Sequence, residues 1–304
     1  MSMPLRASLV IPTYNRGDIL CQAIEQALEQ DYPHLEVVVV DQTASYLSNI
    51  QEGLSRLKPR IRYLTLATPN VSAARNVGVR NATGDIIVFV DDDVKIPRTL
   101  ITSLIPHFAE KKVGAVMGLT LPGDEADPQS VLREAAEIFY ARPDLALGEV
   151  APVKWLSSCC ALYSRKALEE AGLFDDYLKS WCEDADASLR LRDRGYTLLL
   201  DTRVRPVHLH WNQGGCEIRN PQFMDKTELS RLKFLSYFLF KDKRMIGFWG
   251  ITKTLFRAYR DFLFNRRILS RGLRFVWRRH GEFAGAILEA SRAVRSRSLA
   301  KGSA

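Results

Sequence analysis

Apolar runs of strand length alternate with amphipathic stretches over the first 117 residues, and this alternation constrains the fold more than any other feature. The runs ASLVIPTY, LEVVVVD, IRYLTL, DIIVFV and VGAVMGL are rich in Val, Ile and Leu. The stretches between them, such as residues 18–30, 72–81 and 99–110, have helical periodicity and are expected to be helices. Such strands joined by helices are typical of a parallel sheet buried on both faces. The sequence therefore predicts an α/β fold with a doubly wound, mostly parallel sheet.

The charge is divided unevenly along the chain and indicates two regions. The 304 residues carry a net charge of +8. Residues 226–304 hold 19 Lys and Arg against 5 Asp and Glu, which leaves 24 basic and 30 acidic residues in 1–225. We expect a main domain over 1–225, with halves at about 1–117 and 151–225, and a basic helical extension over 226–304. The Pro- and Gly-rich segment 121–150 is expected to be an excursion between the two halves.

The basic extension is also rich in Trp, Phe and Leu. Helical amphipathicity with these residues beside Lys and Arg is typical of a helix at a membrane interface. We expect peripheral attachment to an anionic membrane, with helices packed on the main domain as an equal alternative. Its longest apolar runs, LSYFLF and IGFWGI, fall far short of the roughly 18–20 residues that span a bilayer. The first residues lack a signal-peptide pattern, which favours the cytoplasm or the inner face of the cell membrane.

Polar residues follow each of the first four apolar runs, as PTYN, DQT, TPNVSAARN and DDDV. In open α/β sheets, ligands bind beyond the carboxyl ends of the strands, so these residues are candidates for a binding site. No G-x-G-x-x-G follows the first run and no P-loop sequence occurs. The usual dinucleotide and P-loop fingerprints are therefore excluded.

Three adjacent carboxylates, Asp91, Asp92 and Asp93, follow the run DIIVFV. On an extended strand, Asp91 and Asp93 point to one side and Asp92 to the other. Two oxygen ligands on one side suit Mg²⁺ or Mn²⁺, with water and phosphate oxygens in the remaining positions. A solvated acidic turn is the alternative.

Two further clusters lie in the second half of the main domain. Ser180 and Glu183 have the spacing of a capping box. Asp184 follows in the first helical turn, where the helix dipole favours carboxylates, so a general base and a helix-stabilising charge both remain open. His208 and His210 are two residues apart, a spacing that suits a metal site but is only moderately specific.

Five segments taken together resemble, in order and spacing, the family 2 inverting glycosyltransferases with the GT-A fold. They are SLVIPTYNR, LEVVVVD, VSAARNVGVRNATGDIIVFVDDDV, GLFDDYLKSWCEDADASLRLRDRGY and HLHWNQGG. The resemblance covers about residues 7–215. It implies transfer of a sugar from a nucleotide-diphosphate sugar to a glycan or lipid-linked acceptor, in cell-surface polysaccharide or glycolipid assembly. It also implies a divalent cofactor, Mn²⁺ or Mg²⁺.

The resemblance also assigns residues to the donor. Thr13 and Tyr14 would lie against the nucleobase, Asp41 would accept its N–H, and Arg75 would lie near the nucleotide. The sequence DQT departs from the commoner Asp-Asp-x-Ser, so the resemblance does not say which nucleobase the donor carries. The donor-binding candidates are Pro12, Thr13, Tyr14, Asp41, Arg75, Asp91 and Asp92.

For the metal, the resemblance implies Asp93 with Asp91, completed by His208, with His210 as a second candidate. The second acid of the Glu-Asp pair is the base in the family, which points to Asp184, with Glu183 as a secondary candidate. A metal-dependent sugar-phosphate nucleotidyltransferase is the alternative function. Nucleic-acid binding is disfavoured, because there is no zinc-finger or RNA-binding signature and residues 1–225 are acidic.

Overall fold

The computed structural model describes residues 4–139, 141–179, 182–211, 214–215, 236–237 and 273–302. The chain divides into two compact units, Met1–Cys216 and Glu217–Ala304. The predicted boundary at residue 225 lies outside the described residues, as do residues 226–235 and 238–272 of the predicted extension.

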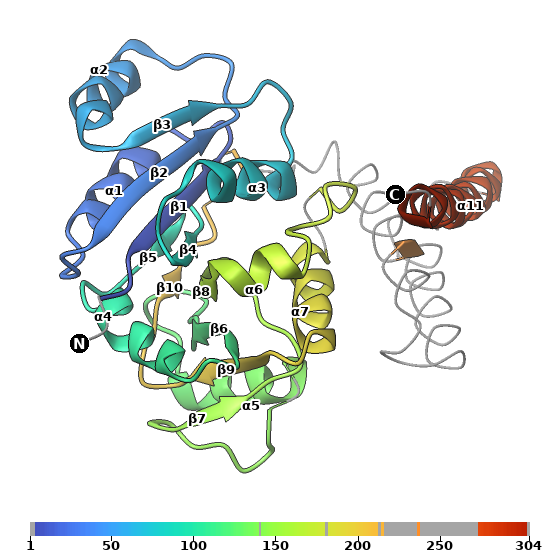
Figure 1. Ribbon diagram of the computed structural model, residues 1–304. Helices are drawn as coiled ribbons and strands as arrows, with labels where there is room; N and C mark the ends of the chain where they lie inside the picture. The colour runs from blue at the N-terminus through green and yellow to red at the C-terminus, as the bar shows by residue number, and fades with distance from the viewer. Residues whose placement is uncertain are drawn as a thin grey trace. The chain divides into compact units, whose positions relative to one another are not determined.

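The first unit is built on an eight-stranded sheet with the order β3-β2-β1-β4-β8-β6-β9-β7 (Figure 1). Together with flanking helices it confirms the predicted α/β fold with a mostly parallel sheet. The strands are β1 (Ala7–Thr13), β2 (Leu35–Asp41), β3 (Arg62–Thr65), β4 (Ile86–Val90), β6 (Val113–Gly118), β7 (Val150–Pro152), β8 (Cys160–Ser164) and β9 (Thr197–Asp201).

Strands β1 to β4 are parallel to one another, in agreement with the alternation of strands and helices in the sequence. Strand β8 lies between β4 and β6 and is antiparallel to both. Strand β7 at the sheet edge is antiparallel to β9. A separate two-stranded sheet pairs β5 (Val94–Lys95) with β10 (Val207–His208), which places His208 opposite Val94. This short pairing places His208 beside Val94, which directly follows the three carboxylates Asp91, Asp92 and Asp93.

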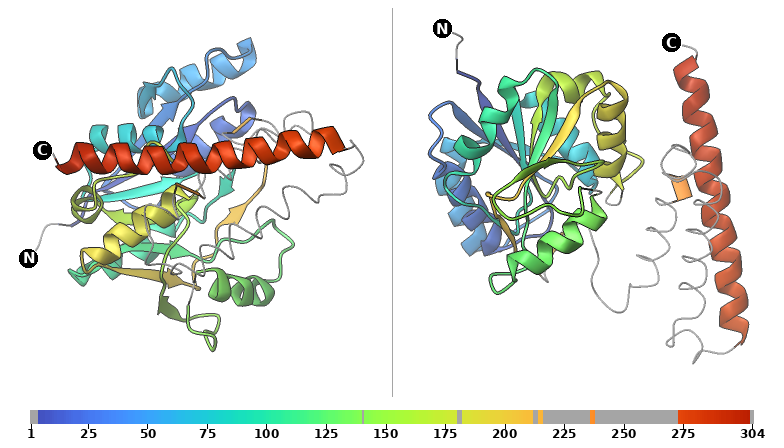
Figure 2. Two further views of the ribbon diagram at one scale, coloured as in Figure 1. Left: turned by 90° about the vertical axis from the view of Figure 1, so that its right-hand side faces the viewer. Right: turned by 90° about the horizontal axis from the view of Figure 1, so that it is seen from below.

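Helices cover both faces of the sheet (Figures 1 and 2). On one face pack α1, α2 and α4, whose apolar residues join those of β1 at 7, 9 and 11 in one core. On the other pack α3, α5, α6 and α7. The bounds are α1 (Asp18–Leu28), α2 (Ser48–Leu57), α3 (Val71–Asn81), α4 (Leu100–Leu104), α5 (Pro128–Ile138), α6 (Arg165–Glu170) and α7 (Glu183–Asp193), with 3-10 helices η1 (Lys58–Arg60) and η2 (Ile105–Ala109).

Local sequence signals set several helix ends. Ser164 caps α6, since its hydroxyl accepts from the Ala167 N–H at 3.4 Å. The helix expected over residues 99–110 stops at Leu104 and continues as the 3-10 helix η2. Pro106 lies at its start, and a proline has no N–H for the α-helical ladder.

The predicted capping box at α7 is wrong. Helix α7 begins at Glu183 itself, after Cys182 in a left-handed conformation (φ 66°), and has no side-chain cap. The Glu183 carboxylate accepts from Arg75 instead. Ser180 lies outside the described residues.

The second unit contains α11 (Leu273–Gly302), a continuous helix of 30 residues (Figure 2). Phe283, Ala286 and Ala290 are buried at helical spacing, while Arg292 and Arg295 are exposed. No helix within the described ranges is long and apolar enough to cross a membrane.

Candidate active site

The carboxyl ends of β1 and β2 meet at the first part of the site. Pro12 pairs with Val40, and Thr13 with Asp41. Pro12, Thr13 and Asp41 are buried, while Tyr14, one residue beyond β1, is half-buried. The predicted donor-binding residues from these two strands therefore share one edge of the sheet.

Asp41 is held by two donors. Its Oδ1 accepts from the Thr43 N–H at 2.8 Å, and its Oδ2 accepts from the Tyr63 hydroxyl. Burial and then the hydrogen bond to Asp41 raise the pKa of Tyr63, so the phenol keeps its proton. The position and orientation of this carboxylate are thereby fixed at the end of β2.

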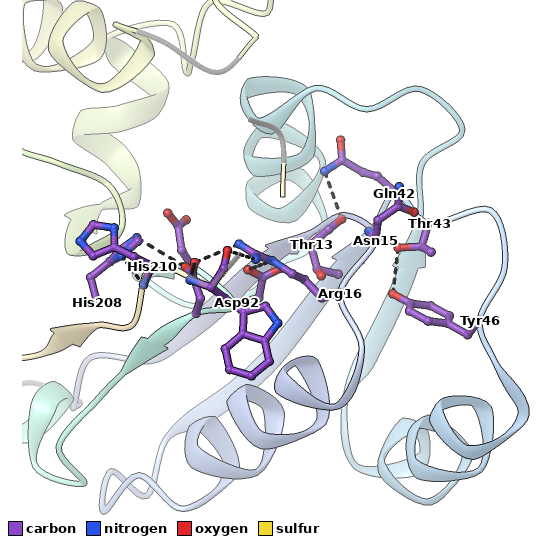
Figure 3. A network of polar contacts seen from close by, with 12 residues as sticks. Thr13, Asn15, Arg16, Gln42, Thr43, Tyr46, Asp92, His208 and His210 are labelled. Atoms are coloured by element: carbon purple, nitrogen blue, oxygen red, sulfur yellow. Dashed lines mark hydrogen bonds and ion pairs between the residues drawn. The ribbon is translucent and has the colours of Figure 1, made fainter. Parts of the chain in front are cut away.

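Gln42 occupies the place where the commoner motif has a second Asp. Its side chain donates to the Thr13 carbonyl at 3.2 Å and accepts from the Asn70 N–H at 2.6 Å. The first contact joins the ends of β1 and β2 (Figure 3), and the second joins the end of β2 to the residue before α3. A carboxylate could accept the second bond but could not donate the first, which gives the departure from the motif a structural role.

The acidic turn does not continue the strand. Strand β4 ends at Val90, and residues 91–93 turn, with the Val94 N–H donating to the Asp91 carbonyl at 3.2 Å. The expected alternation of Asp91 and Asp93 against Asp92 is therefore wrong. Asp91 pairs with Arg75, whereas Asp92 and Asp93 share Arg16.

Arg16 is a site residue that the sequence reasoning missed. Its Nε donates to Asp92 Oδ1 at 2.9 Å and its Nη2 to Asp93 Oδ2 at 3.0 Å, both among buried side chains (Figure 3). Burial raises the pKa of Asp92 to about 7, against the opposing effect of Arg16. The signal was present in the sequence, since Arg16 follows PTYN directly at a strand end that neighbours β4.

Asp93 and His208 are brought together as predicted from the family resemblance. Asp93 Oδ1 lies 3.4 Å from His208 Nε2. His208 Nδ1 accepts from the His210 N–H at 3.1 Å, so its proton lies on Nε2 in the neutral form. His210 is exposed and its ring lies against His208, with centroids 4.1 Å apart. His208, not His210, faces the acidic turn.

The donor set at Asp93 fits a small divalent cation. A carboxylate oxygen and an imidazole nitrogen are both ligands that suit Mn²⁺. Asp93 Oδ1 and His208 Nε2 would hold the ion, since they lie 3.4 Å apart. In the described part of the chain, no group of three or more His, Cys, Asp or Glu is arranged to hold a metal.

Arg75 joins the acidic turn to α7. Its side chain is 3% exposed, and it donates to Asp91 Oδ1 at 3.1 Å and to Glu183 Oε1 at 2.8 Å. Burial raises the pKa of Asp91, while Arg75 opposes this. Burial and then the charge of Asp184 raise the pKa of Glu183 to about 7. The secondary base candidate Glu183 is thus enclosed in an ion pair.

Asp184 is half-buried at the start of α7. Its Oδ2 accepts from the Ser158 N–H at 3.1 Å, and its Oδ1 accepts from the Ala185 N–H at 3.0 Å. Asp186 in the same turn is buried and pairs with Arg190 at 2.8 Å. Asp184 thus accepts from two backbone N–H groups and is partly open to solvent.

A family model described as Glycosyl transferase family 2 matches residues 8–172. The chain belongs to this family. The match includes β1 to α6, with the acidic turn and Arg75, and ends before α7. Asp184 and His208 of this glycosyltransferase therefore lie outside the matched residues.

Curated relatives cover part of the family 2 chain. Glycosyltransferase GlyG of Streptococcus pneumoniae serotype 4 is 31% identical over 145 residues, which is 47% of this chain and 48% of the relative. The GalNAc(5)-diNAcBac-PP-undecaprenol beta-1,3-glucosyltransferase of Campylobacter jejuni is 30% identical over 105 residues, 33% of each chain. The match thus spans about half the length of GlyG.

Solved structures share the fold of this glycosyltransferase. The mannosyltransferase PcManGT from Pyrobaculum calidifontis aligns with a TM-score of 0.56 at 21% identity, over 99% of this chain and 80% of that one. S. aureus TarS aligns with a TM-score of 0.54 at 17% identity, over 95% of this chain and 83% of that one. At these identities the likeness supports the fold.

Proposed function

We propose that this family 2 glycosyltransferase moves a sugar from a nucleoside-diphosphate sugar to an acceptor hydroxyl with inversion, in the assembly of a cell-surface polysaccharide or glycolipid. The observation that carries the proposal is the Arg75 bridge. It joins Asp91, in the turn proposed to hold the donor, to Glu183, the immediate neighbour of the proposed base Asp184. The donor side and the acceptor side therefore share one buried ion-pair network.

The donor would lie along the carboxyl ends of β1, β2 and β4. In the proposed arrangement, Thr13 and Tyr14 flank the base, Asp41 accepts its N–H, and Arg75 and Asp91 lie near the ribose and diphosphate. PcManGT was solved with GDP-Man and Mn²⁺, and GalNAc-T7 with UDP, GalNAc and Mn²⁺. These complexes support a nucleotide-sugar donor for the related fold, while the base and the sugar stay open.

Asp93 and His208 are the proposed ligands of a divalent cation, with diphosphate oxygens in the remaining positions. Coordination through His208 Nε2 would require the imidazole proton to lie on Nδ1, which could then no longer accept the hydrogen bond from the His210 N–H. When bound, the cation would neutralise the negative charge that develops on the leaving diphosphate.

Asp184 is the proposed general base. Its two backbone hydrogen bonds orient the carboxylate while leaving lone pairs to accept the proton of an acceptor hydroxyl. Glu183 and Asp186 are held by Arg75 and Arg190, so no second acid of this turn is placed as a nucleophile. A single base without a covalent intermediate gives inversion at the anomeric carbon, by the logic of inverting glycosidases.

The test is Asp184→Asn in the full chain. Transfer should fall by about 10²- to 10⁴-fold, the usual contribution of a general base, while nucleoside-diphosphate binding stays unchanged. The assay follows nucleoside diphosphate and sugar product during incubation with a panel of nucleotide sugars and Mn²⁺. The exposed Asp124→Asn is the control. Unchanged turnover in Asp184→Asn would remove the assigned base, and release of pyrophosphate would instead indicate a nucleotidyltransferase.

We further propose that the basic second unit attaches to an anionic membrane that carries a lipid-linked acceptor. The name of the C. jejuni relative includes an undecaprenol-linked glycan, which supports this class of acceptor. Vesicles with phosphatidylglycerol should sediment the full chain and phosphatidylcholine vesicles should not. Changing Arg292 and Arg295 to Gln should weaken binding by about 1 kcal/mol per charge, and changing both to Lys should not. Equal binding to both kinds of vesicle would contradict the proposal.

A further inference from the structure

Arg16 is a buried arginine at the donor side to which the mechanism above gives no role. Its guanidinium donates to Asp92 Oδ1, to Asp93 Oδ2 and to the Trp211 carbonyl, at 2.9, 3.0 and 3.1 Å. We propose that Arg16 is a positioning residue that holds both candidate metal ligands, Asp93 and His208, in place for a divalent cation. This inference rests on the metal-assisted function proposed above.

The first step of the argument concerns the two oxygens of Asp93. Oδ2 accepts from Arg16 Nη2 at 3.0 Å and from the Trp211 N–H at 3.1 Å, whereas Oδ1 faces His208 Nε2 at 3.4 Å. Because two donors hold Oδ2, Oδ1 is the oxygen directed toward the imidazole. A carboxylate ligand is commonly oriented in this way by a hydrogen bond to its other oxygen.

The second step concerns the segment that carries His208. Arg16 Nη1 donates to the carbonyl of Trp211, three residues beyond the histidine. The Leu209 N–H donates to the Asp93 carbonyl at 2.8 Å, and His208 pairs with Val94 in the β5–β10 sheet. One guanidinium therefore contacts both the acidic turn and the histidine segment, which are more than 110 residues apart in sequence.

The third step concerns whether Arg16 would be displaced when a metal binds, and the contacts of its guanidinium argue against displacement. Asp92 is 4% exposed, and Arg16 Nε is its ion-pair partner. If Arg16 moved away, the buried Asp92 carboxyl would lose its hydrogen-bond and ion-pair partner at Nε, which is unfavourable. Gly215 also lies close to the Arg16 guanidinium, because a Cβ added at Gly215 would lie 3.0 Å from Nη2. The geometry favours an arginine that stays and supports the ligands.

Arg16 could either position the metal ligands or occupy the place of the cation, and these two roles predict opposite effects on the affinity for Mn²⁺. If Arg16 positions the ligands, replacing it weakens Mn²⁺ binding. If Arg16 occupies the place of the cation, replacing it strengthens Mn²⁺ binding. Arg16→Lys separates them, because Lys keeps the charge but a single ammonium cannot reproduce the planar three-way contact.

The experiment measures the affinity of the full chain for Mn²⁺ by electron paramagnetic resonance of free Mn²⁺, with GDP and separately with UDP present. Arg16→Lys should bind Mn²⁺ about 10- to 100-fold more weakly, as expected for loss of a residue that orients a ligand. Turnover should recover toward that of the unmodified protein at saturating Mn²⁺. The matched control is Arg165→Lys, since Arg165 also donates to backbone carbonyls, those of Gly84 and Val79. It should leave Mn²⁺ affinity unchanged.

Unchanged or tighter Mn²⁺ binding by Arg16→Lys would overturn the inference. Asp93→Asn separates this failure from failure of the proposed function, since Mn²⁺ binding should be lost in that variant. Undiminished binding by Asp93→Asn, or no binding by the unmodified protein, would overturn the metal site and the inference together. If Arg16→Lys does not fold, Asp92→Asn removes the ion pair at Nε and should weaken Mn²⁺ binding by a smaller factor. A folded Asp92→Asn with unchanged affinity would then overturn the inference.

Discussion

Two buried arginines, Arg16 and Arg75, each pair with two carboxylates, but they connect different parts of the chain. Arg16 contacts adjacent residues of one turn, Asp92 and Asp93, and adds the Trp211 carbonyl. Arg75 contacts carboxylates that lie 92 residues apart in sequence, Asp91 and Glu183. The first arrangement organises one side of the proposed site, and the second joins its two sides. Substitutions at the two arginines should therefore have different consequences.

The largest expected effect is that of Arg75→Met on stability. Removing one partner of a buried ion pair costs about 3–5 kcal/mol, because it leaves charge uncompensated. Here both Asp91 and Glu183 lose the guanidinium. Urea unfolding of the full chain should show this loss, with Arg165→Met as a matched control that loses carbonyl contacts and one exposed ion pair. A loss below 1 kcal/mol would mean that the bridge does not hold the two sides together.

A smaller expected effect is the pH dependence of the free energy of unfolding, to which one carboxyl beside each arginine should contribute. The pKa values of Asp92 and Glu183 are both raised to about 7 by burial. Between about pH 5 and pH 7 the folded protein keeps a proton on such a carboxyl that the unfolded chain has lost. The folded state therefore binds more protons, and each group lowers the free energy of unfolding by about 1.4 kcal/mol per pH unit as the pH rises.

Asp92→Asn and Glu183→Gln should each flatten this pH dependence by about one proton. The measurement is the free energy of unfolding at several pH values from 5 to 8, and the exposed Asp124→Asn is the control. Equal flattening would show that both arginines face a carboxyl of the same kind. A slope unchanged in one variant would show that its carboxyl stays ionised throughout this range.

The sequence pattern predicted which residues form strands better than it predicted the order of the strands in the sheet. Strands β1 to β4 follow from the alternation of Val- and Ile-rich runs with helices. Strands β1, β2 and β3 pair in chain order, whereas β4 crosses over to pair with β1. Strand β8 was not predicted as their neighbour. Its pairing with β4 joins residues that are 70 to 78 positions apart, and periodicity carries no information on such a contact. The shortening of α4 was readable in principle from Pro106.

The site was predicted in part. Asp93 with His208 followed from the family resemblance, and the β5–β10 pairing explains how two distant segments meet. The alternation argument failed because it assumed that the strand continued past Val90. Arg16 was missed because a single arginine after a strand has many uses, and only the fold shows which acids face it. Glu183 was interpreted as a cap because its spacing from Ser180 is a local signal that a buried arginine can override.

The position of β8 has a consequence for the order in which the sheet can be completed. Strands β4 and β6 both precede β8 in the chain, yet neither pairs directly with the other. A nascent chain that ends before Cys160 therefore holds the β3-β2-β1-β4 ladder and β6 without the strand that joins them. Strand β8 is synthesised after β4 and β6, the two strands that it joins. Synthesis through Ser164 is therefore needed before β4 and β6 can belong to one continuous sheet.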